Sequence, residues 1–282
     1  MKKFKKNTIK SISLLITLTM VLFLFSGCGN ASSSAGSDNA GSGGDQLSKI
    51  KSAGKIIVGI EGTYPPFTYH EDDGTPAGID VELAQKIAEK LGVEVEFVDG
   101  AWDSLLIGVD SGKFDTVINC VGITDERKEK YDFTEPYYYE GWQIVTRVDD
   151  DSIKSDEDLT GKKIATNISG AHSPWYQEHG VEIVGIDTGD EAISLLLNGR
   201  VDFIDCPVPV MNSYYEAHPE AKEKLKVSYE RKGNEKPTGI PVKKGEKEFL
   251  DALNKALSEL REDGTLKKLS EKYLGGDYTV LD

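Results

Sequence analysis

Short apolar segments alternate with segments of helical periodicity along the chain, and few folds accommodate that order. Lys55–Ile60 is an apolar run typical of a buried parallel strand. Apolar residues then recur every four positions over residues 79–91, which predicts a helix that ends at Gly92. A half-buried strand, a second helix and a third strand are expected over residues 93–98, 102–112 and 113–119. This order predicts an α/β layer with right-handed crossovers.

A junction between helix and strand occurs twice in similar form. Residues 195–205 (LLLNGRVDFID) follow the same local design as residues 108–118 (GVDSGKFDTVI). Each has a helix end, a glycine, a basic residue, one further residue, an aspartate and then an apolar strand. Many helix-to-strand junctions need a glycine, so one copy alone would say little. Two copies indicate two similar α/β lobes, and the cleft between two lobes is a usual place for a small ligand.

The first 27 residues have the pattern of an export signal. Five lysines precede an apolar run over residues 12–25, which is short for a membrane span. Cys28 follows Ser26 and Gly27, a sequence that resembles the lipobox of bacterial lipoproteins, in which the cysteine is acylated. Simple cleavage that releases a soluble protein is the alternative. Residues 29–46 are almost all Gly, Ser, Ala and Asn, a composition typical of a flexible linker.

We therefore expect a signal peptide at residues 1–27, followed by a lipidated Cys28 and a flexible linker at residues 28–46. Two acyl chains such as palmitate would anchor the protein stably, because each buried CH₂ contributes about 0.8 kcal/mol. The expected location is the outer face of the cell membrane.

The charge and the reactive side chains exclude several classes of function. The chain has a formal net charge of −15, and removal of the five signal lysines makes it −20. Such an acidic protein is a poor ligand for nucleic acid or for anionic lipid. The two cysteines after Cys28 form no disulfide framework, and the four histidines do not cluster as metal ligands do. We expect no metal, no cofactor and no catalytic residues.

Seven motifs, in order, resemble the extracellular solute-binding proteins of family 3, which supply polar amino acids to ABC importers. They are VGIEGTYPPFTY, WDSLL, GKFD, ITDERKEKYDFTEPYY, LTGKKIA, NGRVD and ALNKALSELREDGTLKKLSEKYLGGD. The resemblance covers residues 47–282. The variants EGTYPPFTYH, Asn119 before VGIT, and LGGD near the end are most similar to the cystine-binding branch.

This resemblance implies a two-lobed, periplasmic-binding-protein-like α/β fold of type II, with a two-strand hinge and a central ligand cleft. Residues 47–141 plus 240–282 would form lobe 1 and residues 142–239 lobe 2, with the hinge near residues 141–146 and 236–241. The implied protein is a monomeric receptor that closes on a polar amino acid, with cystine as the finer assignment, and delivers it to the permease of an ABC transporter. An exported enzyme on this fold, such as a cyclohexadienyl dehydratase, and a ligand-sensing module are the alternatives.

Arg127 is the implied partner of the ligand's α-carboxylate, in a loop that also contributes Gly122 and Thr124. A planar guanidinium gives a carboxylate two parallel hydrogen bonds, which lysine cannot do. Thr124 can cap the short helix that begins there. The alternative for Arg127 is a surface ion pair with Asp125 or Glu126.

The resemblance also implies contacts from aromatic residues and from a second loop. Tyr64 and Trp102 would pack on the aliphatic part of the ligand, and Phe67 would support them, although all three could be ordinary core residues. In lobe 2 the implied loop consists of Asn167, Ser169, Gly170 and Ala171. The N–H groups of its last three residues would reach the carboxylate, and Ser173 would cap the following helix.

One position departs from the family pattern. Pro207 stands where most members have the aspartate that holds the ligand's α-ammonium. Glu61, and after it Asp205, are the substitutes we expect, and a ligand altered at its amino group is the alternative. Cys120 and Cys206 follow presumed ligand loops, where they are either small buried residues or thiols that exchange with a disulfide ligand.

Overall fold

A computed structural model describes residues 45–281, except for the side chains of residues 232–234, so the expected signal peptide, Cys28 and nearly all of the linker lie outside the described residues. A first sheet holds β1 (Lys55–Ile60) between β5 (Glu94–Asp99) and β6 (Thr116–Val117), with all pairs parallel. The predicted parallel layer is therefore confirmed, but its third strand is only two residues long. Beyond it the chain turns through Cys120, whose φ is 49°.

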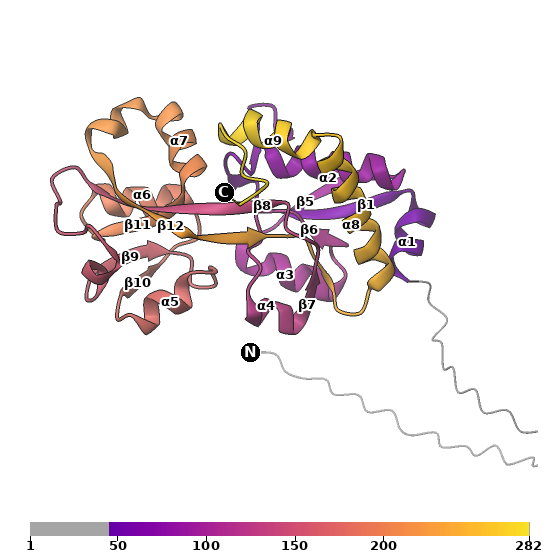
Figure 1. Cartoon of the computed structure of the whole chain (residues 1–282), viewed down its shortest axis with the longest axis horizontal. Coiled ribbons are helices and arrows are strands. Elements are labelled where there is room, and N and C mark those ends of the chain that lie inside the picture. Colours follow the sequence, from indigo (N-terminus) through magenta and orange to yellow (C-terminus); the bar gives the residue numbers. More distant parts are fainter. Residues whose placement is uncertain (1–44, 282) are drawn as a thin grey trace, which may run out of the picture. The chain divides into compact units, whose positions relative to one another are not determined.

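Five helices flank this sheet (Figure 1): α1 (Gln46–Ala53), α2 (Ile79–Leu91), α3 (Trp102–Ser111), α8 (Lys247–Glu262) and α9 (Thr265–Leu274). The predicted apolar stripe of α2 is buried against β1 and against α8. As expected, α2 ends where Gly92 takes a left-handed φ of 68°, which a residue with a Cβ adopts less readily. The buried core of this lobe thus contains residues from both ends of the described chain, such as Ile50 and Leu274.

The second sheet has the order β10-β9-β11-β8-β12. Its strands are β9 (Lys163–Thr166), β10 (Glu182–Gly185), β11 (Phe203–Pro207), β8 (Tyr138–Arg147) and β12 (Leu225–Thr238). β9, β10 and β11 are parallel, whereas β8 is antiparallel to both β11 and β12. The surrounding helices are α5 (Ser173–Glu178), η1 (Asp156–Leu159), α6 (Gly189–Leu197), α7 (Val208–Ala217) and η2 (Pro219–Glu223).

The junction that recurs in the sequence has the same structure in both lobes. The Asp115 carboxylate accepts the N–H of Ile57 at 2.7 Å, and the Asp202 carboxylate accepts the N–H of Lys163 at 2.7 Å. In each lobe the aspartate therefore bonds the first part of the neighbouring parallel strand. This shared bond explains why the aspartate recurs at the same place in both copies.

The long strands β8 and β12 of the second sheet extend beyond it toward the first lobe (Figure 1). The proposed lobe boundary at residues 141 and 142 falls inside β8, and that at residues 239 and 240 directly follows β12. Smaller sheets pair β7 (Tyr131–Phe133) with β13 (Pro241–Lys243), and β2 (Thr63–Tyr64), β3 (Thr68–His70) and β4 (Pro76–Ala77) in sequence. No helix among residues 45–281 has the length and apolar character needed to span a bilayer.

Candidate ligand-binding site

A cavity of about 170 Å³ lies between the two lobes, beside the crossing strand β8. Nine of the residues expected at a ligand site line it: Glu61, Tyr64, Trp102, Gly122, Arg127, Asn167, Gly170, Ala171 and Asp205. Three expected residues, Phe67, Thr124 and Ser169, are not among its lining residues. The cavity volume suits a small metabolite.

Arg127 is held at the cavity by groups from both lobes. It lies on α4 (Asp125–Lys130), where Thr124 acts as the predicted cap by accepting the Arg127 N–H at 3.2 Å. The guanidinium donates through Nη1 to the Gly122 carbonyl at 2.8 Å and through Nη2 to the Ser169 carbonyl at 3.1 Å. It also lies 5.3 Å from the centre of the Trp102 ring. A guanidinium has five N–H donors, so donors remain for a ligand.

The ion pairs considered as the alternative for Arg127 do not form. Asp125 pairs with Lys128, and Glu126 pairs with Lys130. Within residues 45–281 no carboxylate lies within ion-pair distance of the Arg127 guanidinium. Burial lowers the pKa of Arg127, and the charges of Glu140 and Glu126 oppose that effect. The arginine is therefore a half-buried cation that a carboxylate ligand could neutralise.

The aromatic residues divide into a wall and its support. Tyr64 and Trp102 line the cavity. Phe67 is buried, with 1% of its surface exposed, and stacks on Tyr64 with ring centres 5.2 Å apart. Its other face meets the Tyr138 ring edge-on at 5.5 Å. Phe67 thus packs against Tyr64 without lining the cavity itself, and its supporting role stays a prediction.

Asn167 organises the second loop. Its Oδ1 accepts the N–H of Ser169 at 2.8 Å, and its carbonyl accepts the N–H of Gly170 at 3.0 Å. These two N–H groups, expected to face the ligand, are therefore already bonded within the loop. The Ser169 hydroxyl lies 2.5 Å from Oδ1 of Asp103 on α3, which joins the two lobes across the mouth of the cleft.

The helix after this loop begins differently from the expectation. Ser173 was expected as the cap, but α5 already includes it, and its hydroxyl donates to the Asn167 carbonyl at 2.6 Å. This expectation was wrong because the serine side chain turns back to the loop and does not accept a helix N–H. The bond ties the start of α5 to the cavity loop.

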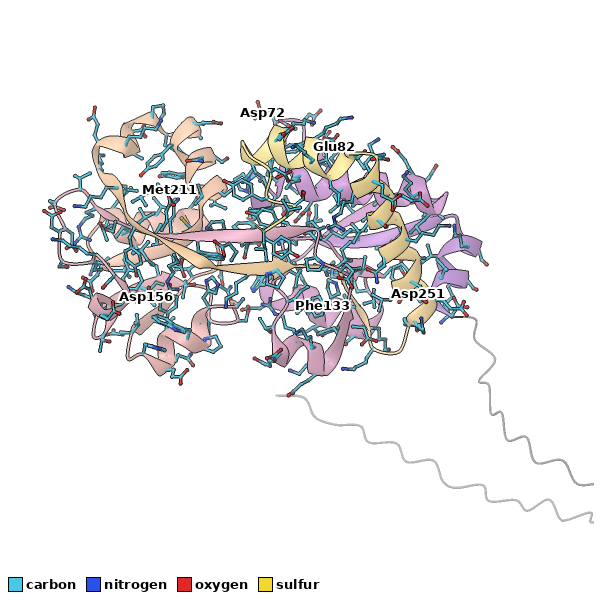
Figure 2. The ribbon with its side chains drawn as sticks, viewed as in Figure 1. Asp72, Glu82, Phe133, Asp156, Met211 and Asp251 are labelled. Atoms are coloured by element: carbon cyan, nitrogen blue, oxygen red, sulfur yellow. The ribbon has the colours of Figure 1, made fainter. Side chains whose placement is uncertain are left out.

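Asp205 reaches the cavity, but buried neighbours engage it. Its Oδ2 accepts hydrogen bonds from the Tyr176 hydroxyl and from His172 Nδ1, the latter at 3.1 Å, and lies 3.6 Å from Nη1 of Arg231. Arg231 in turn donates through Nε to Asp156 at 2.8 Å. Burial alone would lower the pKa of Arg231, but the hydrogen bond to Asp156 and the surrounding charges raise it. Figure 2 labels Asp156 in the lower half of this lobe.

Glu140 is a cavity residue that sequence reasoning missed. It lies on β8 with 4% of its surface exposed, and it lines the cavity. Its Oε1 accepts from Cys120 Sγ at 2.9 Å and its Oε2 from Trp142 Nε1 at 3.0 Å. Burial raises the pKa of the Glu140 carboxyl, against these two bonds. A lone acid within the aromatic strand segment YYYEGW was the signal that could have found it.

Glu61 is a cavity acid that is more accessible than Glu140. The Thr63 hydroxyl donates to its Oε1 at 3.3 Å, and Asn119 Nδ2 lies 3.5 Å from its Oε2. Burial raises the pKa of Glu61, against these hydrogen bonds. Glu61 thus faces the cavity, and its hydrogen-bond partners, Thr63 and Asn119, are both uncharged.

The two thiols also border the cavity. Burial and the charges of Glu140 and Asp80 raise the pKa of Cys120 well above its usual value, and burial raises that of Cys206. Because the thiolate is the nucleophile in disulfide exchange, these shifts favour the interpretation of both cysteines as small buried residues. Among residues 45–281, no three His, Cys, Asp or Glu side chains are grouped as a metal site requires.

Comparison with known proteins identifies the family and the fold. The model of the bacterial extracellular solute-binding proteins, family 3, matches residues 56–276. The L-cystine-binding protein TcyA of Bacillus subtilis is 36% identical over 266 residues, which are 93% of this chain and 97% of that protein.

Two solved structures share the fold. An ancestral arginine-binding protein bound to arginine has a TM-score of 0.73 and 39% identity, covering 79% of this chain and 99% of its own. The L-cystine solute receptor of Neisseria gonorrhoeae, unliganded and open, has a TM-score of 0.59 and 35% identity, covering 85% of this chain and 100% of its own. The likeness is thus greater to the ligand-bound structure of these two.

Proposed function

Since this chain belongs to the bacterial extracellular solute-binding proteins of family 3, we propose that it is the receptor of an ABC importer for a polar amino acid. The observation that carries this proposal is the Arg127 guanidinium, which faces the cavity, is bonded by carbonyl groups of both lobes and has no acidic partner within residues 45–281. Arg127 would bind the ligand's carboxylate. The cavity residues named above, with Thr124, Phe67 and Ser169 as their supports, would complete the site.

L-cystine is the ligand we propose. TcyA, whose name gives cystine as its ligand, matches nearly the whole chain. The motif EGTYPPFTYH also supports this choice, and it contributes Glu61 and Tyr64 to the cavity. Arginine is the second candidate, because the ancestral protein with a TM-score of 0.73 is bound to arginine.

We further propose that the receptor is a monomer attached to the outer face of the cell membrane through acylated Cys28. The linker composition of residues 29–46 supports a tether of this kind. Labelling with an alkyne analogue of palmitate tests the anchor, since a Cys28→Ala variant should lose the label and leave the membrane fraction. Label retained in that variant would contradict the anchor and leave the ligand proposal intact.

We propose that the protein binds without chemical turnover. The residues that face the cavity suit a zwitterion, and the two thiols there are held protonated. An exported dehydratase on this fold would convert a cyclohexadienyl acid such as prephenate or arogenate. Incubation of purified protein with these acids, followed by chromatography, should show no product, and multiple turnovers would overturn the receptor proposal.

A thermal-shift panel of the twenty common amino acids and cystine tests the ligand class. A ligand present at 100 times its Kd should stabilise the protein by about 2.7 kcal/mol. Arg127→Ala should abolish that stabilisation, because the carboxylate loses its paired donors, and should leave the melting temperature of the unliganded protein nearly unchanged. Lys128→Ala, one residue further along α4 and paired only with Asp125 on the surface, is the matched control and should bind normally. A large loss of unliganded stability in Arg127→Ala would instead make Arg127 a structural residue.

A further inference from the structure

We propose that Glu140 is the counter-charge that selects ligands with a protonated amino group, and that Cys120 and Trp142 hold its carboxylate in position. This inference rests on the proposed function, because Arg127 must orient the carboxylate end of the same ligand. It assigns the ammonium to a residue of the crossing strand β8, and not to Glu61 or Asp205.

The first argument is the isolation of the Glu140 charge. Glu140 is 4% exposed and lines the cavity, yet among the side chains that the structure describes, which exclude residues 232–234, no basic group lies within ion-pair distance of it. An ionised carboxylate is costly to bury unless another charge or several hydrogen bonds compensate it. Two donors reach Glu140, one on each oxygen, whereas an ionised carboxylate offers about four acceptor sites. Acceptor capacity therefore remains for a ligand that brings a positive charge.

The second argument is the state of the other acids. Besides Glu140, three acids line the cavity: Glu61, Asp187 and Asp205. Asp205 already faces the Arg231 guanidinium at 3.6 Å and accepts from His172 at 3.1 Å, so its charge is largely compensated within the protein. Only its Oδ1 has no partner. Asp187 is exposed and Glu61 is partly exposed, so solvent screening weakens the attraction of both for a ligand charge. Glu140 is thus the most deeply buried acid of the cavity without a basic partner.

The third argument is the position of Glu140 in the sheet. Trp142 on β8 is paired directly with Pro207 on β11, and Glu140 is two residues before Trp142. Side chains two residues apart on a strand point to the same face of the sheet. Glu140 therefore supplies a carboxylate on the face where Pro207 has none. The charge of Glu140 is also close enough to act on Arg127, so one cavity presents an anion and a cation to the two ends of a zwitterion.

Cys120 is the positioning residue in this arrangement. Its φ of 49° lies in the left-handed region, which is costly for a residue with a Cβ and marks sites with a special task. The Cys120 N–H donates to Asp80 Oδ2 at 2.6 Å, which fixes the turn. The thiol then points to Glu140 Oε1 at 2.9 Å. The turn thus brings a small donor against the carboxylate that it must orient.

The test compares ligands with and without an amino group. Isothermal titration of wild type and Glu140→Gln is done with L-cystine and with 3,3′-dithiodipropionate, which keeps both carboxylates and the disulfide but has no amino group. L-arginine and 5-guanidinopentanoate form a second pair. Glu140→Gln should lower the affinity for the amino acid that wild type binds by at least about 30-fold, as is usual when a buried charge pair loses one partner. The affinity for the deaminated analogue should change less than about threefold.

Glu61→Gln is the matched control, with the same change of side chain in the same cavity, and should lower the affinity for both ligands of a pair by similar small factors. Cys120→Ala should weaken only the amino acid, and Cys120→Ser, which restores a donor, should recover it. Equal losses for both ligands in Glu140→Gln would overturn the assignment. A loss confined to the amino acid in Glu61→Gln or Asp205→Asn, and not in Glu140→Gln, would also overturn it.

Two further results separate this inference from the proposed function. Arg127→Ala should weaken the amino acid and its deaminated analogue alike, because both keep the carboxylate. Glu140→Gln should unfold at the same temperature as wild type or higher without ligand, since it removes an unpaired buried charge. A wild type that binds neither amino acid would overturn the proposed ligand and the role of Glu140 together.

Discussion

Asp80 is a carboxylate with no solvent access, placed in the first turn of α2. It accepts hydrogen bonds from the Tyr137 hydroxyl at 2.9 Å and from the Cys120 N–H at 2.6 Å. Burial nevertheless raises its pKa from 3.8 to about 7. The folded protein therefore holds this proton more tightly than the unfolded chain does, and the stabilisation is complete below pH 3.8 and lost as the pH rises through about 7.

We predict that Asp80→Asn flattens the pH dependence of stability. In wild type this group should lower the free energy of unfolding by up to about 1.4 kcal/mol per pH unit between about pH 4 and pH 7. The amide keeps the shape of the side chain but does not titrate in this range. Urea unfolding of both proteins at about pH 5 and pH 8 measures the difference. An equal loss of stability between these pH values in both proteins would show that other groups cause the slope.

Residues differ in how far the sequence reveals them, and the reason is where their partners lie. Arg127 is part of a long local motif, so its place at the cavity could be predicted. Asp80 and Glu140 depend on contacts with residues that are 20 to 57 positions away, and no local pattern contains those contacts. The sequence indicated that Pro207 lacks a carboxylate, but not which strand could supply one.

At the scale of elements, Arg231 on β12 connects three parts of the second lobe. It lies between Asp156 of η1 and Asp205 of β11, and its guanidinium is 4.3 Å from the centre of the Trp175 ring on α5. The side chain is 4% exposed. These contacts fix α5 and β11 against β12. β11 carries cavity residues, and α5 follows the cavity loop that includes Gly170 and Ala171.

We predict that Arg231→Met destabilises the protein by about 3–5 kcal/mol, because it leaves the buried Asp205 carboxylate without its cation. The double variant Arg231→Met with Asp205→Asn should recover part of that loss, since no charge remains unpaired. Chemical denaturation of these two variants and of Asp205→Asn alone gives the free energies of unfolding for a double-mutant cycle. Additive losses in the double variant would show that the two residues do not act as a pair.

Helices were the most predictable elements, because periodicity and terminal glycines are local signals. Residues 79–91 and their end at Gly92 agree with α2. The strand expected over residues 113–119 is only Thr116–Val117. The chain turns soon after it, because the Cys120 N–H bonds to Asp80 on α2. The repeated aspartates were visible in the sequence, but their bonds to the neighbouring strands required the sheet.

At the scale of the whole molecule, polar contacts between described residues join the two lobes at the cleft. Ser169 makes two of them, with its hydroxyl against Asp103 at 2.5 Å and its carbonyl against Arg127 at 3.1 Å. Such contacts favour closure, and the apparent affinity for a ligand depends on the fraction of closed molecules. The motif order predicted two lobes and a cleft, whereas this contact brings together residues 66 positions apart and could not be predicted.

We predict that Asp103→Ala opens the unliganded protein. Its radius of gyration in solution scattering should rise, while saturating ligand should return the variant to the liganded value of wild type. Ligand affinity should fall by less than about tenfold, because each such bond contributes about 0.5–1.5 kcal/mol. Asp251→Ala on α8, which removes only a surface pair with Lys247, is the control. An unchanged radius in Asp103→Ala would show that the contact does not set the opening.

The pairing of Arg147 with Leu225 has a consequence for how such receptors diversify. Residues 148–224 follow β8, include β9, β10 and β11 of the same sheet, and end beside the end of β8, where β12 begins; α1 and α9 both belong to the other lobe. That segment is therefore a cassette with adjoining ends. Genetic exchange of this one stretch between related genes would replace most of one lobe, and with it part of the ligand preference that we propose, while the other lobe would keep Arg127.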